Sequence, residues 1–167
     1  MGQIAYYAPL KSPHHAVPSG DREIARSVMR ALEMNALGLD VVLASELRSY
    51  DGRGDVSVQS EIKLRAAAEA ERLLMSGKDW TAWVTYHNYY KAPDLIGPAV
   101  CERLGIPYLL IEASISKRRL NGPWSDFAER SDFATSAADV VFYLTERDSV
   151  ALKEFQSLTQ KLSLIHI

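Results

Sequence analysis

The chain has 167 residues, of which 47% are hydrophobic and 24% charged, a composition that suits one globular domain with a sizeable core. The net charge of -2, with lysine and arginine spread along the chain, argues against a nucleic-acid binder, and the single cysteine, Cys101, excludes an intrachain disulfide framework. No run approaches the roughly 18 consecutive apolar residues of a membrane span, and no signal-peptide pattern precedes the first apolar run, so we expect a cytoplasmic protein without a membrane span.

Five short apolar runs alternate with helical patterns, and the runs cover residues 4–8, 41–45, 82–86, 108–112 and 140–145. The helical patterns begin near Ser19, span residues 58–75, begin near Pro93, span residues 123–138 and begin at Thr145. Runs with so little polar alternation are typical of strands covered on both faces. The alternation predicts an α/β fold, with a Rossmann-like parallel sheet of about five strands and helices on both faces.

The end of the chain departs from this pattern. After Phe155 the last predicted helix passes into a tail without a stop signal, and residues 162–167 look like translated sequencing-adapter read-through. We therefore predict a domain over residues 1–155 and a truncated or non-native tail over residues 156–167. An ordinary frayed terminus is the alternative interpretation.

The loop after the first predicted strand is long and ends in small residues, Ser19 and Gly20, followed by Asp21. It contains neither the glycine-rich dinucleotide fingerprint nor the Walker pattern, so we expect no bound cofactor. A glycine at a helix start still lets backbone N–H groups meet a phosphate or a sugar hydroxyl, although Asp21 disfavours an anion. His14 and His15 have no third metal ligand in view, and we expect no metal.

The segment after the third predicted strand contains His87, Asn88 and Tyr89 among further tyrosines. Aromatic faces combined with amide and hydroxyl donors suit a sugar or polyol, since rings stack on C–H faces and polar tips bind hydroxyls. The alternative is that the tyrosines cover the sheet edge and that Asp94 caps the next helix.

Glu112 ends the fourth predicted strand, at the edge of the sheet where ligands bind in such folds. A carboxylate there either faces a cation or the ligand crevice, or it pairs with Lys117 or Arg118 as part of the scaffold. The sequence does not separate these two interpretations.

Taken in order, these segments resemble the N-terminal Rossmann-like domain of family-4 retaining glycosyltransferases, which have the two-domain GT-B fold. The resemblance covers residues 1–155 and rests on segments 18–21, 39–45, 83–87, 105–110 and 138–146. It implies a strand order of 3-2-1-4-5. It also implies that this domain forms the acceptor side of the cleft, with His87 and the loop around Gly20 facing the donor's sugar and phosphates. It also implies that the nucleotide-sugar pocket and the main catalytic groups belong to a second domain, absent from these residues.

The chain departs from the family at two places. It has Ser19 before Gly20 where many members carry two glycines, and Glu112 where a histidine is common. The resemblance implies transfer of a sugar from a nucleotide-activated donor to a sugar, lipid or small-molecule acceptor, with this fragment alone inactive. The alternatives are a free-standing Rossmann-like ligand-binding domain without catalysis and, less compatible with the missing glycine fingerprint, a nucleotide-dependent enzyme such as an epimerase.

Overall fold

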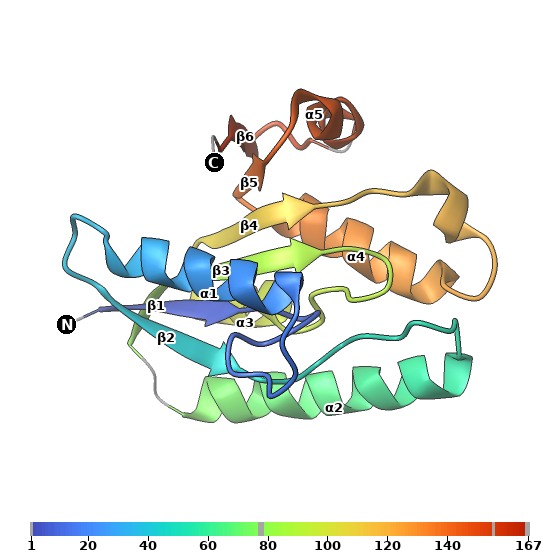
Figure 1. Ribbon diagram of the computed structural model, residues 1–167, viewed down its shortest axis with the longest axis horizontal. Helices are drawn as coiled ribbons and strands as arrows, with labels where there is room; N and C mark the ends of the chain where they lie inside the picture. Colours follow the sequence, from blue (N-terminus) through green and yellow to red (C-terminus); the bar gives the residue numbers. More distant parts are fainter. Residues whose placement is uncertain (1, 77–78, 155, 166–167) are drawn as a thin grey trace.

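Figure 1 shows the computed structural model of the chain, which describes residues 2–76, 79–154 and 156–165. The strands are β1 (Gln3–Tyr7), β2 (Asp40–Ser45), β3 (Trp80–Asn88), β4 (Tyr108–Ala113), β5 (Val140–Tyr143) and β6 (Lys161–Leu164). The helices are α1 (Gly20–Glu33), α2 (Val56–Met75), α3 (Gly97–Leu104), α4 (Ser125–Ala137) and α5 (Glu146–Lys153), with a short 3₁₀ turn η1 (Lys117–Leu120). Within the described residues, none of these helices is long and apolar enough to cross a membrane. The predicted α/β class is confirmed.

The strands form one parallel sheet in the order β2-β1-β3-β4-β5-β6, which corrects the expected order 3-2-1-4-5. Strand β2 is only half-buried along most of its length, which suits an edge, whereas β1 and β3 are mostly buried and occupy the centre. Helix α2 therefore carries the chain from β2 back past β1, and β3 pairs with the free side of β1. The strand order reverses between β1 and β3.

A sixth strand, β6, lies in the segment that the sequence analysis treated as a tail. It pairs in parallel with β5, with Leu162 opposite Val141. Gln160 anchors the chain just before it, because its side-chain amide donates to the carbonyls of Thr135 and Ala138 at 2.6 and 2.7 Å. The sheet thus has one strand more than expected, while residues 166 and 167 lie outside the described residues. A non-native origin of the tail stays a prediction.

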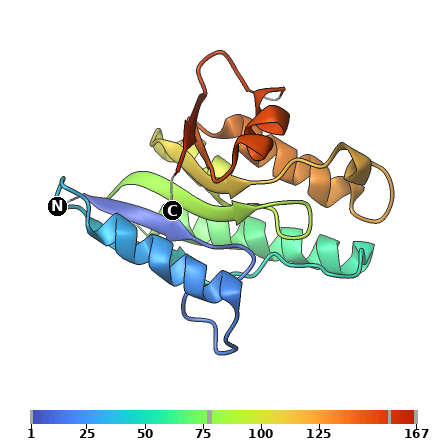
Figure 2. The same cartoon turned by 45° about the horizontal axis from the view of Figure 1, so that its top comes forward.

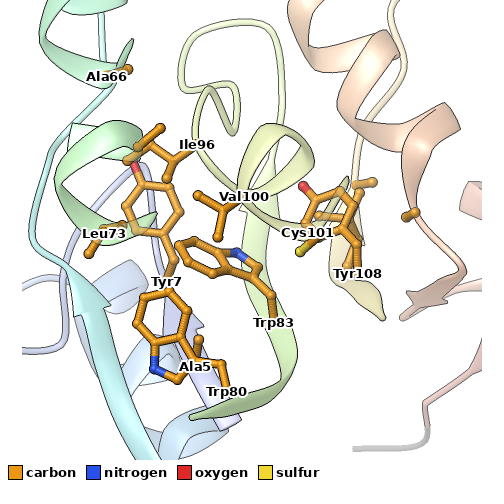
Figure 3. Close-up of a cluster of buried hydrophobic side chains, with 14 of the residues drawn as sticks. Ala5, Tyr7, Ala66, Leu73, Trp80, Trp83, Ile96, Val100, Cys101 and Tyr108 are labelled. Atoms are coloured by element: carbon orange, nitrogen blue, oxygen red, sulfur yellow. The ribbon is translucent and has the colours of Figure 1, made fainter. Parts of the chain in front are cut away.

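Apolar side chains fill both faces of the sheet. The larger cluster lies against α2 and α3, where Trp83 meets Trp80 and Tyr7 edge to face with ring centroids 5.5 and 6.0 Å away (Figure 3). The smaller cluster lies under α1, where the Tyr6 hydroxyl donates to the Ala25 carbonyl at 3.0 Å. Figures 1 and 2 show α1 (blue) on one face and α2 (green) and α4 (orange) on the other. Helices on both faces are therefore confirmed.

Two predicted helix starts are confirmed by their caps. The Ser19 hydroxyl accepts the N–H of Arg22 at 3.2 Å and caps α1. Thr145 and Asp148 form a reciprocal capping box at α5. Both caps are local patterns within four residues, which is why the sequence alone predicts them.

The third helix begins at Gly97 and not near Pro93 as expected. The carboxylate of Asp94 accepts the N–H groups of Ile96 and Gly97 at 2.9 and 2.8 Å, and this local bonding holds the intervening residues in a turn. The alternative that Asp94 caps the helix is corrected, because Ile96 is the N-cap of α3, and Asp94 instead holds the turn that precedes it. Gly105, at φ 64°, ends α3 in the left-handed conformation that glycine favours.

Candidate functional site

The carboxyl edge of the sheet is where ligands bind in open α/β folds, at the point where the strand order reverses. Here that point lies between β1 and β3, at the right of Figure 1, so the loop after β1 and the segment after β3 are neighbours. Asp21 in the first turn of α1 and His87 near the end of β3 come within 3.8 Å, measured from Oδ1 to Nδ1. The structure therefore brings together two segments that the sequence analysis singled out separately.

His87 has a backbone φ of 65°, a left-handed conformation that is uncommon for residues other than glycine. Its ring stacks on Tyr89 with centroids 4.7 Å apart and 25° between the planes. The side chain is 18% exposed, and within the described part of the chain its Nδ1 has no hydrogen-bond partner. The Asp21 carboxylate faces Nδ1 and favours a hydrogen there, which leaves Nε2 as the ring nitrogen for a ligand.

Glu112, the penultimate residue of β4, has the same left-handed conformation, with φ 61°. The pairing of β3 with β4 puts it in the position that matches His87 on the neighbouring strand. Glu112 also lies beside Tyr86, whose pKa is raised well above its usual value by burial and by this carboxylate. Among the described residues Glu112 forms no ion pair with Lys117 or Arg118, the two alternative partners, and Lys117 is paired with Glu154 instead. Strained backbone of this kind clusters at binding sites, which favours the crevice interpretation.

The start of α1 forms the other side of the site. Gly20 is exposed, and no atom lies within 4 Å of the position that a Cβ would take, so the space in front of the first turn is open. The guanidinium of Arg22 donates to the His15 carbonyl at 3.0 Å and holds the long loop against the helix. Since Asp21 adds a negative charge at this helix start, the open space suits a sugar hydroxyl better than a phosphate.

Asn88 does not belong to the exposed surface of the site. It is fully buried, and its amide donates to the Ser131 carbonyl at 2.9 Å and to Thr135 Oγ1 at 3.0 Å on α4. Its Oδ1 accepts the N–H of Asp94 at 2.9 Å. The expectation of a ligand contact is therefore corrected to a positioning role, in which Asn88 fastens the segment carrying His87 to α4.

Asp94 is the centre of a buried hydrogen-bond network that the sequence analysis did not predict. Besides the two N–H groups of the turn, its carboxylate accepts the hydroxyls of Thr85 at 2.5 Å and Tyr108 at 2.8 Å. The Trp83 indole N–H donates in turn to Thr85 at 2.8 Å. Burial raises the pKa of Asp94, while the hydrogen bonds from Thr85, the backbone and Tyr108 oppose that rise. The N–H of Asp94 also donates to Asn88, which joins this network to the segment that carries His87.

A run of rings continues from His87 along the carboxyl edge, through Tyr89 and Tyr90 to Trp124. The centroid distances are 5.6 Å between Tyr89 and Tyr90 and 5.9 Å between Tyr90 and Trp124. Burial, followed by nearby tyrosines and Asp21, raises the pKa of Tyr89 to about 12, so its hydroxyl is a neutral donor at physiological pH. The sequence analysis missed Trp124, for which the available signal was an aromatic residue in a loop after a predicted strand.

Two hollows lie away from these rings. One, of about 730 Å³, opens at the opposite edge of the sheet, where Pro107 and Asp139 precede β4 and β5. The other, of about 630 Å³, is an apolar groove beside α1, and Ile24 in its lining is 45% exposed. Neither hollow has His87 in its lining. The candidate site is thus separate from both hollows.

Other reactive side chains contribute little to a site. Cys101 is buried, and burial raises the pKa of its thiol well above the usual range. His14 is exposed, with Nδ1 3.7 Å from the Glu46 carboxylate. Among residues 2–76, 79–154 and 156–165, no three histidine, cysteine or acidic side chains come together as metal ligands would.

Comparison with known proteins gives a distant likeness. No family model and no curated protein matches the sequence. Among solved structures, the chain is similar to a UDP-glucosyltransferase from Polygonum tinctorium, described as capable of glucosylating indoxyl and solved in complex with 3,4-dichloroaniline, with a TM-score of 0.48 and 11% identity. The match covers the whole of this chain and 52% of that one, so the chain spans about half the length of that enzyme. At this level of likeness nothing follows about activity.

Proposed function

We propose that the chain is the acceptor-side half of a cytoplasmic glycosyltransferase that moves a hexose-like unit from a nucleotide-activated donor to an acceptor with retention of configuration. The observation that carries the proposal is the meeting of His87 with the start of α1 at the reversal of the strand order. An imidazole, an open glycine and a carboxylate face one another there, beside a run of aromatic rings. The resemblance of residues 1–155 to family-4 glycosyltransferases supports the reaction class.

Each residue has a role that its geometry allows. Through Nε2, His87 accepts from a sugar hydroxyl when neutral and donates to a phosphate oxygen when protonated, while Glu112 on the next strand accepts from a sugar hydroxyl. Tyr89 supplies a ring face and a hydroxyl donor. The groups that bind the nucleotide and stabilise the departing diphosphate belong, in this proposal, to a second domain. Catalysis then depends on closing that domain over this wall, so that donor and acceptor are held together.

Nucleotide binding by the 167-residue chain tests whether the nucleotide pocket belongs to a second domain. We expect NAD, UDP, GDP and ADP to bind no more tightly than about millimolar, because the loop after β1 has no phosphate cradle and Asp21 stands at the helix start. Isothermal titration calorimetry measures this directly. A micromolar constant for any of these nucleotides contradicts the assignment of the donor pocket to a second domain.

The function itself is tested on the protein encoded by the reading frame that continues past Phe155. Incubated with UDP-, GDP- and ADP-hexoses and a panel of acceptors, it should release nucleoside diphosphate and add one hexose mass to an acceptor. The anomeric configuration of the product, read by NMR, decides between retention and inversion. No release with any pair, or a stop codon soon after Phe155, contradicts the proposal and favours a free-standing ligand-binding domain. That candidate gains support from β6, which extends the sheet past β5 within this chain.

A further inference from the structure

We propose that Arg119 and Lys91 form an anion-binding subsite at the end of the ring run, and that the acceptor is therefore an acidic saccharide. This inference rests on the proposed function and names the acceptor class that the resemblance leaves open. It concerns Tyr90 and Lys91, which belong to the segment after the third predicted strand, together with Arg119 and Trp124.

Both cations lie against the same pair of rings. The Arg119 guanidinium carbon is 4.9 Å from the centroid of Tyr90 and 5.5 Å from that of Trp124. The Lys91 ammonium is 5.9 and 5.4 Å from the same two centroids. The two rings stand at 87° to each other, so they form a corner that holds both cations in cation–π contact.

The charges of this corner are not neutralised by the protein. Within the described residues neither Arg119 nor Lys91 forms an ion pair, whereas the neighbouring Lys117 is paired with Glu154. Asp51 belongs to the same corner, since its carbonyl accepts the Trp124 indole N–H at 3.1 Å. Its carboxylate, however, is engaged elsewhere. It accepts the side-chain amide of Gln59 at 2.8 Å and three backbone N–H groups, those of residues 53 to 55.

These hydrogen bonds hold the Asp51 carboxylate on Gln59 and on the backbone of residues 53 to 55. Burial raises its pKa, but the bonds from Gln59 and the backbone more than offset that effect, so the pKa of Asp51 lies below its usual value. The carboxylate is therefore charged and fully hydrogen-bonded without contacting either cation. Two positive side chains remain for an external anion.

A guanidinium held against rings is well prepared for a carboxylate or a phosphate. The ring contacts restrict its rotamers, so less conformational entropy is lost when an anion binds, and its planar N–H fork remains available for bidentate hydrogen bonds. The rings themselves offer faces to the C–H side of a sugar. A saccharide that lies along the ring run with one end at His87 thus brings an acidic group at its other end to Arg119.

The test is a titration of the ¹⁵N-labelled chain at low salt, followed by NMR through the indole N–H signal of Trp124. The probes are methyl β-glucuronide, glucose 6-phosphate and the neutral methyl β-glucoside. We expect both anionic probes to bind about tenfold more tightly than the neutral one, as for charge-assisted hydrogen bonds. Arg119→Gln and Lys91→Gln should each lower the affinity for the anionic probes about five- to tenfold and leave the neutral probe unchanged.

Arg118→Gln is the matched control, because it removes the same charge from the neighbouring position, and Arg118 makes no cation–π contact among the described residues. We expect the control to change the affinity for the anionic probes by less than about twofold at moderate salt. The thermal midpoint of each variant shows that the fold is retained.

Three outcomes overturn the inference: equal affinity for the glucoside and the anionic probes, the same loss in Arg118→Gln as in Arg119→Gln, or tighter binding of the oligonucleotide dT10 than of any saccharide. Preference between glucuronide and glucose 6-phosphate identifies the acid as a carboxylate or a phosphate, and either preference supports the subsite. The measurement needs no transfer reaction. If the complete protein is a transferase but this chain binds no acidic sugar, only the present inference is refuted. If this chain binds acidic sugars but the complete protein is not a transferase, only the proposed function is refuted.

Discussion

The variant His87→Ala should lower kcat/KM of the complete enzyme by roughly ten- to a thousandfold, about 1.4 to 4 kcal/mol of transition-state binding, with the thermal midpoint little altered. The imidazole has an unbonded Nδ1 and stacks on Tyr89, so its removal costs ligand contacts more than hydrogen bonds within the fold. The measurement is a steady-state assay of hexose transfer, with thermal unfolding in parallel.

His14→Ala is the matched control, since it removes an imidazole from an exposed position in the loop after β1. It should leave both kcat/KM and the thermal midpoint near the parent values. If His87 only orients its segment, His87→Ala instead loses stability and retains near-normal activity in the folded fraction. Full activity together with full stability would falsify the site assignment, and with it most of the case for the segment after β3.

Asp94→Ala should lower the free energy of unfolding by about 3 to 5 kcal/mol, because it leaves several buried donors without an acceptor at a cost of about 1 to 3 kcal/mol each. The carboxylate accepts four hydrogen bonds, and its loss leaves the hydroxyls of Thr85 and Tyr108 without their acceptor. Urea denaturation measures the change. Asp126→Ala, which removes a partly exposed carboxylate paired with Lys63, should cost no more than about 1 kcal/mol. If Asp94→Ala lowers the free energy of unfolding by no more than Asp126→Ala does, the central role of the network is contradicted.

The same network has a pH signature. Because burial raises the pKa of Asp94 above its unfolded value of about 3.9, ionisation of this group disfavours the folded state. Its contribution to stability is complete below the unfolded pKa and is lost as the pH rises through the raised one. The stability advantage of the parent over Asp94→Asn should therefore shrink as the pH rises from about 4. An advantage that grows with pH contradicts the direction of the shift.

The sequence predicts the features of this fold that are local. The five apolar runs of the sequence form strands, and Ser19 and Thr145 cap their helices. Each of these patterns involves neighbours within a few residues. The strand order was predicted wrongly, since β2 and β3 compete for the sides of β1 and long-range burial decides between them. Strand β6 was missed because its run of four residues lies in the segment that was interpreted as a truncated or non-native tail.

The candidate site divides in the same way. His87, Gly20 and Asp21 were predicted from their places after strands, and the reversal between β1 and β3 brings them together. Asn88 was predicted as a ligand contact but faces α4, because no sequence pattern reveals the left-handed backbone that precedes it. Trp124 reaches the ring run only through tertiary packing against Tyr90.

The left-handed backbone at His87 and Glu112 has a consequence for how this chain tolerates change. Each such residue costs about 1 to 3 kcal/mol relative to a relaxed conformation. Glycine adopts that conformation without steric penalty, and asparagine does so more readily than most residues. Selection for thermal resistance alone should therefore drive both positions toward glycine or asparagine, while selection for transfer should keep histidine and glutamate. At the adjacent ends of β3 and β4, a substitution that raises the thermal stability of this protein should therefore lower its transfer activity.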